Sequence, residues 1–250
     1  PHPDFYEVQI DGILAFHSAD YAKAVEAFDE LIRRRPDSAD ERLWRASAYE
    51  ELAQPLKAMT DYEVAAALKP NDVVSRVNLA RLKTQTGALE EADQLLRRAL
   101  QADPGNARVH ESLSANLLEQ GRRKVSDQDP AAAGKLFAQA EAEAREALKA
   151  DPNLAWAQVN LGASLMEQNR QDPDPRRVEE AVSHYDQALK LRQAARPDPK
   201  DPLYLTALVN QCDALIQEKS LDKALEACRQ VTDLQPDNAV AFYNLAGVYA

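Results

Sequence analysis

Glycine, cysteine and aromatic residues are scarce in this 250-residue chain, which has 7 Gly, 2 Cys and 6% aromatic residues. It contains no glycine-rich nucleotide-binding motif, and no GxSxG or HExxH motif either. No stretch approaches the roughly 18 uninterrupted apolar residues of a membrane-spanning helix. The 4 histidines lie far apart, without cysteine or carboxylate neighbours at the spacing of metal ligands. The sequence therefore predicts no catalytic site, cofactor, metal or membrane span.

Basic residues are also too few and too dispersed for a nucleic-acid-binding protein. The chain has 30 Lys and Arg against 41 Asp and Glu, a net charge of −11, and no basic run exceeds the three residues of Arg33 to Arg35. Because affinity for nucleic acid comes mainly from neutralising phosphates, we expect no such partner. No charged start followed by an apolar secretory segment is present, which favours the cytoplasm. The missing initiator Met leaves a removed leader open, and with it a periplasmic or secreted location.

The sequence does contain a pattern of paired helices, which is clearest between Val73 and Asn106. The pattern predicts helices over Val73–Gln85 and Leu89–Gln101, separated by Thr86-Gly87, since glycine tolerates the positive φ that ends a helix. Asp103-Pro104 ends the second helix, because proline cannot continue the hydrogen-bond ladder. The apolar stripe of that second helix is Ala92, Leu95, Leu96, Ala99 and Leu100. Two such helices cannot bury a core alone, so we expect copies of the unit to stack.

The copies are visible as a repeating proline. Pro36, Pro70 and Pro104 are 34 residues apart, and so are Pro202 and Pro236. The two remaining gaps, on either side of Pro152, are 48 and 50 residues and therefore contain insertions. Ten residues after each proline stands a small residue: Ala46, Ala80, Ser114, Gly162, Cys212 and Ala246.

This phased pattern resembles the tetratricopeptide repeat family over nearly the whole chain. The resemblance implies an all-α, right-handed α-solenoid that acts as a non-enzymatic scaffold for protein–protein interaction. We expect one continuous domain over residues 1–250, since a solenoid grows by stacking like units. The repeats are predicted at about 5–38, 39–72, 73–106, 107–152 with an insertion, 153–202 with insertions, and 203–238, with a partial repeat at 239–250.

The insertions predict longer helices in the fourth and fifth repeats. Asp129-Pro130 and Asp174-Pro175 each read as an N-cap and first helical residue, so we expect second helices to begin there. A link with three prolines, at 196–202, lengthens the connection to the sixth repeat. Turns within repeats share one edge of such a solenoid, so the two excursions should be neighbours. They are either tolerated surface insertions or a second docking edge.

Cys212 and Cys228 fall where the two helices of the sixth repeat should touch. Both positions take small side chains in the family, so the sequence predicts two buried thiols. A disulfide between them is the alternative, because the two residues face each other in such a pair.

The resemblance also implies a concave groove, lined by the first helix of each repeat. The residue just before the inward Leu points into it: Asn78, Asn160, Asn210 and Asn244, with Trp44 and Ser112 in two other repeats. An amide can pair with the backbone of a bound peptide through both its donor and its acceptor, or it can bond a neighbouring helix or water. We expect an apolar partner segment, with Trp156 as anchor. The flanking residues are Val77, Val159 and Val209, and Arg81 and Arg108 give a small basic spot.

Two other interpretations stay open. The chain is expected to be a fragment of a longer protein, so it could be the regulatory or targeting arm of a kinase or transferase whose catalytic domain lies elsewhere. Alternatively, it is a self-assembling scaffold, in which Phe242, Leu245 and Tyr249 of the last helix pack against the first repeat of another copy.

Overall fold

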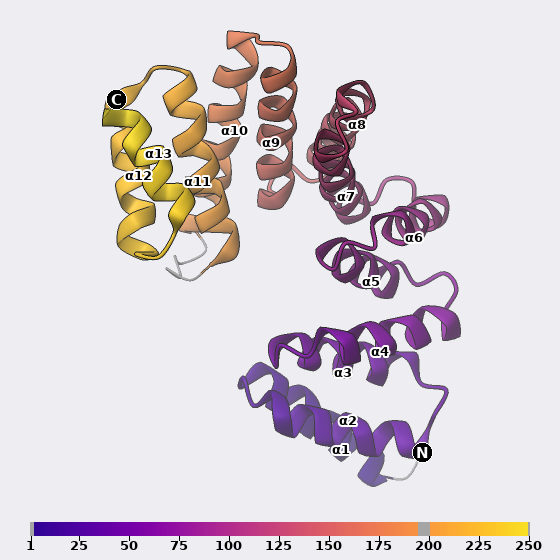
Figure 1. The fold of residues 1–250 in the computed structure, drawn as a ribbon. Helices are drawn as coiled ribbons and strands as arrows, with labels where there is room; N and C mark the ends of the chain where they lie inside the picture. The colour runs from indigo at the N-terminus through magenta and orange to yellow at the C-terminus, as the bar shows by residue number, and fades with distance from the viewer. Residues whose placement is uncertain (1–2, 195–200, 250) are drawn as a thin grey trace. The chain divides into compact units, whose positions relative to one another are not determined.

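Every element in the computed structural model is an α-helix (Figure 1). The structure describes residues 3–194 and 201–249, and there is no strand among them. The chain divides into two compact units, Pro1–Pro104 (unit 1) and Gly105–Ala250 (unit 2), which are described separately. Stacked helix pairs give the chain the predicted architecture of a right-handed α-solenoid. That the repeats form one continuous domain stays a prediction.

Unit 1 contains three helix pairs. They are α1 (Pro3–His17) with α2 (Tyr21–Arg34), α3 (Ala39–Glu51) with α4 (Pro55–Leu68), and α5 (Val73–Gln85) with α6 (Leu89–Ala102). The predicted bounds of α5 are confirmed: Asp72 caps it by accepting from the N–H groups of Val74 and Ser75. Gly87, with φ +83°, follows its end. Ala19 and Ala53 take the same left-handed conformation after α1 and α3, so the turn does not require glycine.

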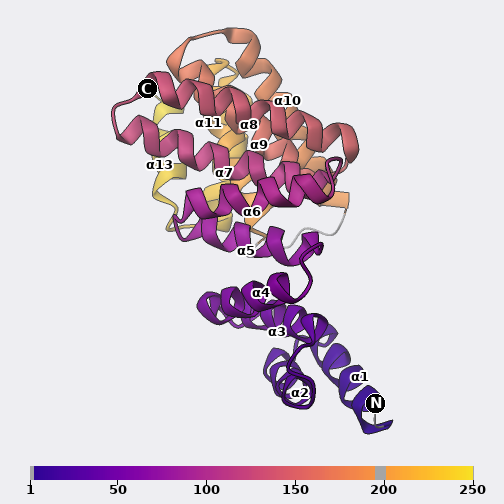
Figure 2. The same ribbon diagram turned by 90° about the vertical axis from the view of Figure 1, so that its right-hand side faces the viewer.

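Unit 2 contains three helix pairs and one further helix. They are α7 (Ala107–Ser126) with α8 (Pro130–Ala150), α9 (Ala155–Gln171) with α10 (Pro175–Ala194), α11 (Pro202–Gln217) with α12 (Leu221–Leu234), and α13 (Ala239–Tyr249). Figure 2 shows the long α7 and α8 side by side. Both predicted restarts are confirmed, since α8 begins at Pro130 and α10 at Pro175. Most of the proline-rich link, 195–200, lies outside the described residues.

The two insertions of unit 2 are neighbours, as predicted, since a Cβ added to Gly134 of α8 would lie 2.7 Å from Oε1 of Gln171 in α9. Arg122, near the end of α7, donates from Nε to Glu167 Oε1 of α9 at 3.0 Å. Gln168 of α9 donates to Glu141 Oε2 of α8 at 2.7 Å. The insertions therefore lengthen α7, α8 and α9 into a shared edge, and a docking role for that edge stays a prediction.

The pairs α9–α10 and α7–α8 of unit 2 each contain a point where a glycine of one helix meets an aromatic ring of the other. A Cβ added to Gly162 of α9 would lie only 2.7 Å from Cε1 of Tyr185 in α10. The extended pair α7–α8 has a similar contact, because a Cβ on Gly121 would overlap with Cε1 of Phe137. Tyr185 and Phe137 are both buried. These glycines therefore allow a close approach of two helices rather than a turn.

Replacing Gly162 by alanine should destabilise unit 2 by about 1–2 kcal/mol. Overpacking against the Tyr185 ring costs about 1–3 kcal/mol, and the better helix propensity of alanine returns up to about 1 kcal/mol. Chemical denaturation followed by circular dichroism would measure the change. Gly247→Ala is the matched control, because a Cβ at Gly247 meets nothing within 4 Å. Equal stability of the two variants would contradict the crossing contact.

The pair α11–α12 crosses differently, through a disulfide between Cys212 and Cys228 whose Cα atoms are 5.3 Å apart. The expectation of two buried thiols is therefore wrong for this structure, and the alternative holds. Both side chains are fully buried, in a cluster with Leu215, Ala224 and Ala227. A covalent bond takes the place of the aromatic ring that fills this crossing in α1–α2, α3–α4 and α9–α10.

The inward position of α3 is occupied by Arg45, where Leu stands in most other repeats. Its guanidinium donates from Nε and Nη2 to the two oxygens of Asp61 in α4, at 2.7 and 2.6 Å. A third bond, 2.6 Å long, runs from Nη1 to Asp29 of α2. Burial alone would lower the pKa of Arg45, but the bonds to Asp61 and Asp29 outweigh it and raise that pKa. One largely buried arginine, 17% exposed at its side chain, thus joins three helices of unit 1.

Candidate partner-binding groove

Helix α9 is enclosed by its neighbours, and this removes two predicted residues from the candidate surface. Its ten consecutive residues Ala157–Met166 are all buried. Val159, 3% exposed, belongs to the main core of unit 2. Asn160, 7% exposed, donates from Nδ2 to the backbone oxygen of Glu111 in α7 at 3.1 Å. Asn160 therefore bonds a neighbouring helix, the alternative that the sequence left open for these amides.

Trp156, by contrast, is 39% exposed at the start of α9. Arg108 in α7, Thr206 in α11 and Val240 in α13 hold the same repeat position, and all three are exposed. Their separations of 48, 50 and 34 residues equal those of the repeating prolines. Because α7, α9, α11 and α13 pack in succession, these side chains form a row along the beginnings of the first helices. We call Arg108, Trp156, Thr206 and Val240 the first-helix row.

A cavity of about 360 Å³ lies beside this row. Its lining residues are Pro202, Leu205, Thr206, Val209 and Asn210 of α11, with Gln235 and Asn238 from the α12–α13 connection. Val209 is half-buried and packs against the core, as a wall of the cavity. The Asn210 amide is half-buried and has no hydrogen bond to another residue in the described part of the chain. Two predicted residues, Val209 and Asn210, therefore line this cavity, and their role in binding stays a prediction.

Asn238 is fixed in the wall of the same cavity. Its Nδ2 donates to Gln235 Oε1 at 2.8 Å, and its Oδ1 accepts from the backbone N–H of Ala241 at 3.0 Å. It thereby caps the first turn of α13. The sequence reasoning missed Gln235 and Asn238 because it considered only the helices. The short spacing between Pro236 and the start of α13 is the signal that could have placed Gln235 and Asn238 beside this cavity.

The predicted residues in unit 1 are mostly engaged inside that unit. Val77 is buried, and Asn78 beside it is half-buried. Arg81 forms an ion pair with Glu50, which compensates the charge of the arginine. Glu50 also accepts a hydrogen bond from the Tyr62 hydroxyl at 2.6 Å. Trp44 packs on Phe16 and Phe28, with ring centroids 5.3 and 6.2 Å apart. Arg81 and Arg108 belong to different units, so the basic spot stays a prediction.

The other predicted residues of unit 2 divide between core and surface. Ser112 and Asn244 are each 7% exposed. Phe242 and Tyr249 are 49% and 64% exposed, and their role in self-association stays a prediction. Leu245 differs, because it is half-buried and packs against the cluster around Cys212 and Cys228. The prediction that Leu245 is presented outward is therefore wrong: α11 and α12 already cover that side of α13.

Toward the ends of the first helices the surface becomes charged. Arg122 binds Glu119 Oε1 of its own helix at 2.5 Å and Glu167 of α9 at 3.0 Å. Arg170 binds Glu167 Oε2 at 2.8 Å and Asp213 Oδ2 of α11 at 2.7 Å. Although burial alone would lower the pKa of Arg122, Glu119 and Glu167 raise it. We call these five residues, which join α7, α9 and α11, the charged row.

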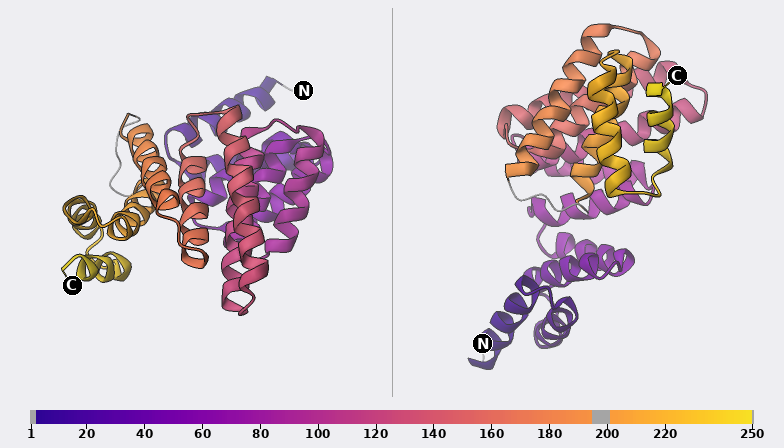
Figure 3. Two further views of the ribbon diagram at one scale, coloured as in Figure 1. Left: turned by 90° about the horizontal axis from the view of Figure 1, so that it is seen from above. Right: turned by 90° about the vertical axis from the view of Figure 1, so that its left-hand side faces the viewer.

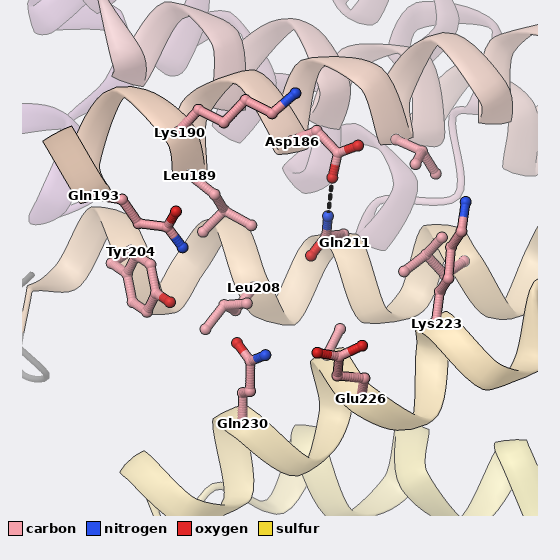
Figure 4. Close-up of a pocket in the computed structure, with 13 residues that line it drawn as sticks. Asp186, Leu189, Lys190, Gln193, Tyr204, Leu208, Gln211, Lys223, Glu226 and Gln230 are labelled. Carbon is pink, nitrogen blue, oxygen red and sulfur yellow. Dashed lines mark hydrogen bonds between the residues drawn. The ribbon is translucent and has the colours of Figure 1, made fainter.

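A second cavity, of about 300 Å³, lies between α10, α11 and α12 (Figure 4). Leu189 and Leu208 contribute to its apolar lining, while Lys190 and Lys223 extend along its walls. Gln211, at an inward position held by Leu in most repeats, donates there to Asp186 of α10. The sequence showed Gln211 as a departure from the repeat but not its partner, which is 25 residues away.

Neither a metal site nor a membrane span is found in the described ranges. Within residues 3–194 and 201–249, no group of three or more His, Cys, Asp or Glu residues could hold a metal ion. None of the helices within those ranges is long and apolar enough to cross a membrane.

Comparison with known proteins gives the family. Two models described as tetratricopeptide repeat match the chain, one at residues 51–117 and the other at 12–73 and 174–248. The chain is 24% identical to DnaJ homolog subfamily C member 3 of Gallus gallus over 94% of its own length. It spans only 37% and 38% of the lengths of the two curated relatives that it matches, the second being a small glutamine-rich tetratricopeptide protein of Mycosarcoma maydis.

Solved structures show the same fold. The pilus biogenesis factor PilW is 17% identical, with all of both chains covered and a TM-score of 0.67. YrrB, described as a TPR protein with an unusual peptide-binding site, is 20% identical, with 88% of this chain and 98% of that chain covered and a TM-score of 0.51. Tetratricopeptide proteins are generally scaffolds for protein interaction and typically non-catalytic. The family models, which match more than half of the residues, show that this chain belongs to the tetratricopeptide repeat family.

Proposed function

We propose that unit 2 binds an apolar segment of a partner protein along the first-helix row and into the cavity at Asn210. The observation that carries this proposal is the cavity itself, which joins apolar walls to an amide without an internal partner. Ligand sites in proteins typically combine an apolar lining with a few polar groups that fix orientation. The cavity has both features.

Each group has a distinct role in this proposal. Trp156 supplies a large, partly exposed ring on which an apolar side chain of the partner packs. Val209 and Leu205 receive a second apolar side chain inside the cavity. The Asn210 amide then pairs with the partner's backbone, which sets its direction without requiring a particular sequence. The peptide-binding site named for YrrB supports a peptide as ligand.

Asn160 and Asn244 have no part in this proposal. Asn160 bonds Glu111 and both side chains are buried, so a peptide would have to displace α7 or α11 to reach them. The proposed contact is therefore one amide between two apolar sites rather than a ladder of four amides.

The test is selection of peptides from a random displayed library on the whole chain. We expect the selected peptides to be rich in apolar residues. Trp156→Ala and Asn210→Ala should each weaken their binding by about tenfold or more, which corresponds to about 1.4 kcal/mol. Fluorescence anisotropy of labelled peptides measures the affinities, and circular dichroism should show unchanged helicity and melting, since neither side chain is fully buried.

Leu56→Ala is the matched control, because Leu56 is an apolar residue of unit 1 that is 74% exposed. Its binding should equal that of the unmodified chain. Peptides that bind both groove variants at full affinity would contradict the proposal. The interpretation of the chain as a regulatory arm of a larger enzyme stays a prediction.

A further inference from the structure

Two polar side chains in the cavity at Asn210 are held in fixed orientations by the backbone. Figure 3 (right) shows α13 beside α12, and the short connection that joins them lies at the end of unit 2 where α11 begins. Thr206 of α11 and Gln235 of this connection both line the cavity. Each side chain has one hydrogen bond inside the protein, and that bond decides what the side chain can still offer to a ligand.

Gln235 is left as a hydrogen-bond donor. The backbone N–H of Ala241 can only donate, so the atom of Asn238 that it meets at 3.0 Å must be the amide oxygen Oδ1. The other end of this amide, Nδ2, can only donate, and it therefore bonds the oxygen Oε1 of Gln235 at 2.8 Å. The Nε2 group of Gln235 has no hydrogen bond to another residue in the described ranges. Its two N–H bonds stay available to a ligand.

Thr206 is left as a hydrogen-bond acceptor. Its hydroxyl donates to the backbone oxygen of Pro202 at 2.7 Å, and a carbonyl oxygen can only accept. The single hydroxyl proton is therefore used, while the lone pairs of Oγ1 stay available. The cavity thus has a donor from one element and an acceptor from another, with the apolar side chains of Leu205 and Val209 in its wall.

The lining of the cavity contains no charged side chain among the described residues. The neighbouring carboxylate of Asp201 is buried and paired with Arg192, and the exposed Asp237 would repel an anion. A carboxylate or phosphate would lose water here without gaining a cation as partner, which is costly. A neutral group that both accepts and donates is therefore favoured, and a peptide bond is such a group.

We propose that the cavity binds a peptide bond of the partner, whose carbonyl accepts from Gln235 and whose N–H donates to Thr206. This inference rests on the proposed function, in which a partner segment enters the cavity beside Asn210. It makes the neutral backbone of that segment, rather than a charged terminus or side chain, the group that is recognised. A trans peptide bond points its C=O and N–H in opposite directions, so a donor and an acceptor from different elements favour one chain direction. Gln235 and Thr206 contact the ligand, and Asn238 is a positioning residue that acts through Gln235.

Replacing Asn238 by aspartate should reverse the orientation of the Gln235 amide. The new carboxylate still accepts from the N–H of Ala241, and aspartate caps a helix as well as asparagine does. It cannot donate to Gln235, however, so Nε2 must turn to donate to the carboxylate, and the acceptor Oε1 is left for the ligand. Gln235→Glu keeps the bond from Asn238 and likewise offers no donor. We expect each variant to bind a peptide backbone about tenfold more weakly, the usual effect of one lost hydrogen bond, with unchanged melting.

The probe is N-acetyl-leucine methylamide, a neutral molecule with two peptide bonds and one apolar side chain. Its comparison is N-acetyl-leucine, in which a carboxylate replaces the second peptide bond. Binding of so small a molecule is expected at about millimolar concentration, and NMR titration of the whole chain detects it through the side-chain amide signals of Gln235 and Asn210. We expect both signals to shift with the neutral probe and to stay in place with the carboxylate.

Ala239→Asp is the matched control, because Ala239 is exposed at the start of α13 and the variant adds the same charge without touching Gln235. It should bind the neutral probe like the unmodified chain. Equal binding of the probe by Asn238→Asp, equal binding of the carboxylate, or no shift with either molecule would overturn the inference.

The peptides selected on the whole chain separate this inference from the proposed function. If their affinity falls in Asn210→Ala but is unchanged in Gln235→Glu and Asn238→Asp, the inference fails and the proposed function stands. If the neutral probe shifts Gln235 but the peptides ignore Trp156 and Asn210, the cavity binds a peptide bond and the proposed course of the partner along the first-helix row fails.

Discussion

Replacing Asp61 by alanine should destabilise unit 1 by about 3–5 kcal/mol, the usual cost of breaking a buried ion pair. Asp61 is 2% exposed and receives two bonds from Arg45, which is itself mostly buried. After the change, the arginine keeps Asp29 but loses its bidentate partner in a site with little access to water. The remaining cost is that of an incompletely paired charge.

Fluorescence of Trp44 measures this change selectively, because the chain has only 2 Trp and the other can be replaced as Trp156→Phe. Chemical denaturation in that background reports on unit 1. Asp40→Ala is the control, since Asp40 pairs with Lys69 at the surface and should contribute at most about 1 kcal/mol. A loss below that value for Asp61→Ala would show that the Arg45–Asp61 pair contributes no more stability than an exposed ion pair.

The double variant Arg45→Leu/Asp61→Leu separates the value of the pair from the cost of breaking it. It restores the apolar residue found at this position in most repeats, and apolar replacement of buried ion pairs is often neutral or stabilising. We expect the double variant to regain most of the stability lost in Asp61→Ala. A double variant as unstable as the single one would mean that the network contributes net stability.

Removal of the disulfide should have the second large effect, about 3 kcal/mol in unit 2. The bond closes a loop with a sequence separation of 16 residues, and loops of this length gain about that much from a cross-link. Repeat pairs α1–α2 and α9–α10 fill the same crossing with Phe28 and Tyr185. Two thiols, or two alanines, leave that space poorly packed, so repeat six depends on the bond more than on burial.

Hydrogen exchange with mass spectrometry locates the effect. In Cys212→Ala/Cys228→Ala, amides of α11, α12 and α13 should exchange faster, while those of α1 to α4 stay unchanged. A reducing agent should produce the same pattern in the unmodified chain and no further change in the double variant. Unchanged protection of α12 after reduction would rule out this role for the bond.

Helix positions could be predicted from the sequence because their determinants are local. The turn at Gly87, the proline at 130 and the spacing of apolar residues each act within a few positions, and α5, α8 and α10 begin where they predict. The long α7 was predicted only from the length of the insertion. Gly121 lies inside α7, where the ring of Phe137 in the next helix packs on it, and this contact could not be predicted from the local sequence.

The candidate site could be predicted only in part, since exposure depends on contacts between repeats. Asn160 and Asn210 hold the same repeat position and have the same chemistry. Asn160 is buried because α7 lies against α9 and offers the Glu111 carbonyl, whereas Asn210 faces the cavity before α13. The partners of Arg45 and Gln211 likewise come from other helices, 16 and 25 residues away. No local pattern distinguishes these cases.

The charged row has a mechanical consequence for unit 2. Glu167 is shared by Arg122 and Arg170, so α7, α9 and α11 are joined by side chains of fixed length at one end of their first-helix surface. Sliding one helix past the next must break ion pairs there, whereas near Trp156 α9 is joined to α7 by the hydrogen bond from Asn160 to the Glu111 carbonyl. The two ends of this surface are thus held by different kinds of interaction, one charged and one neutral. Because exposed ion pairs weaken as salt screens them, ionic strength sets how far the charged end can yield.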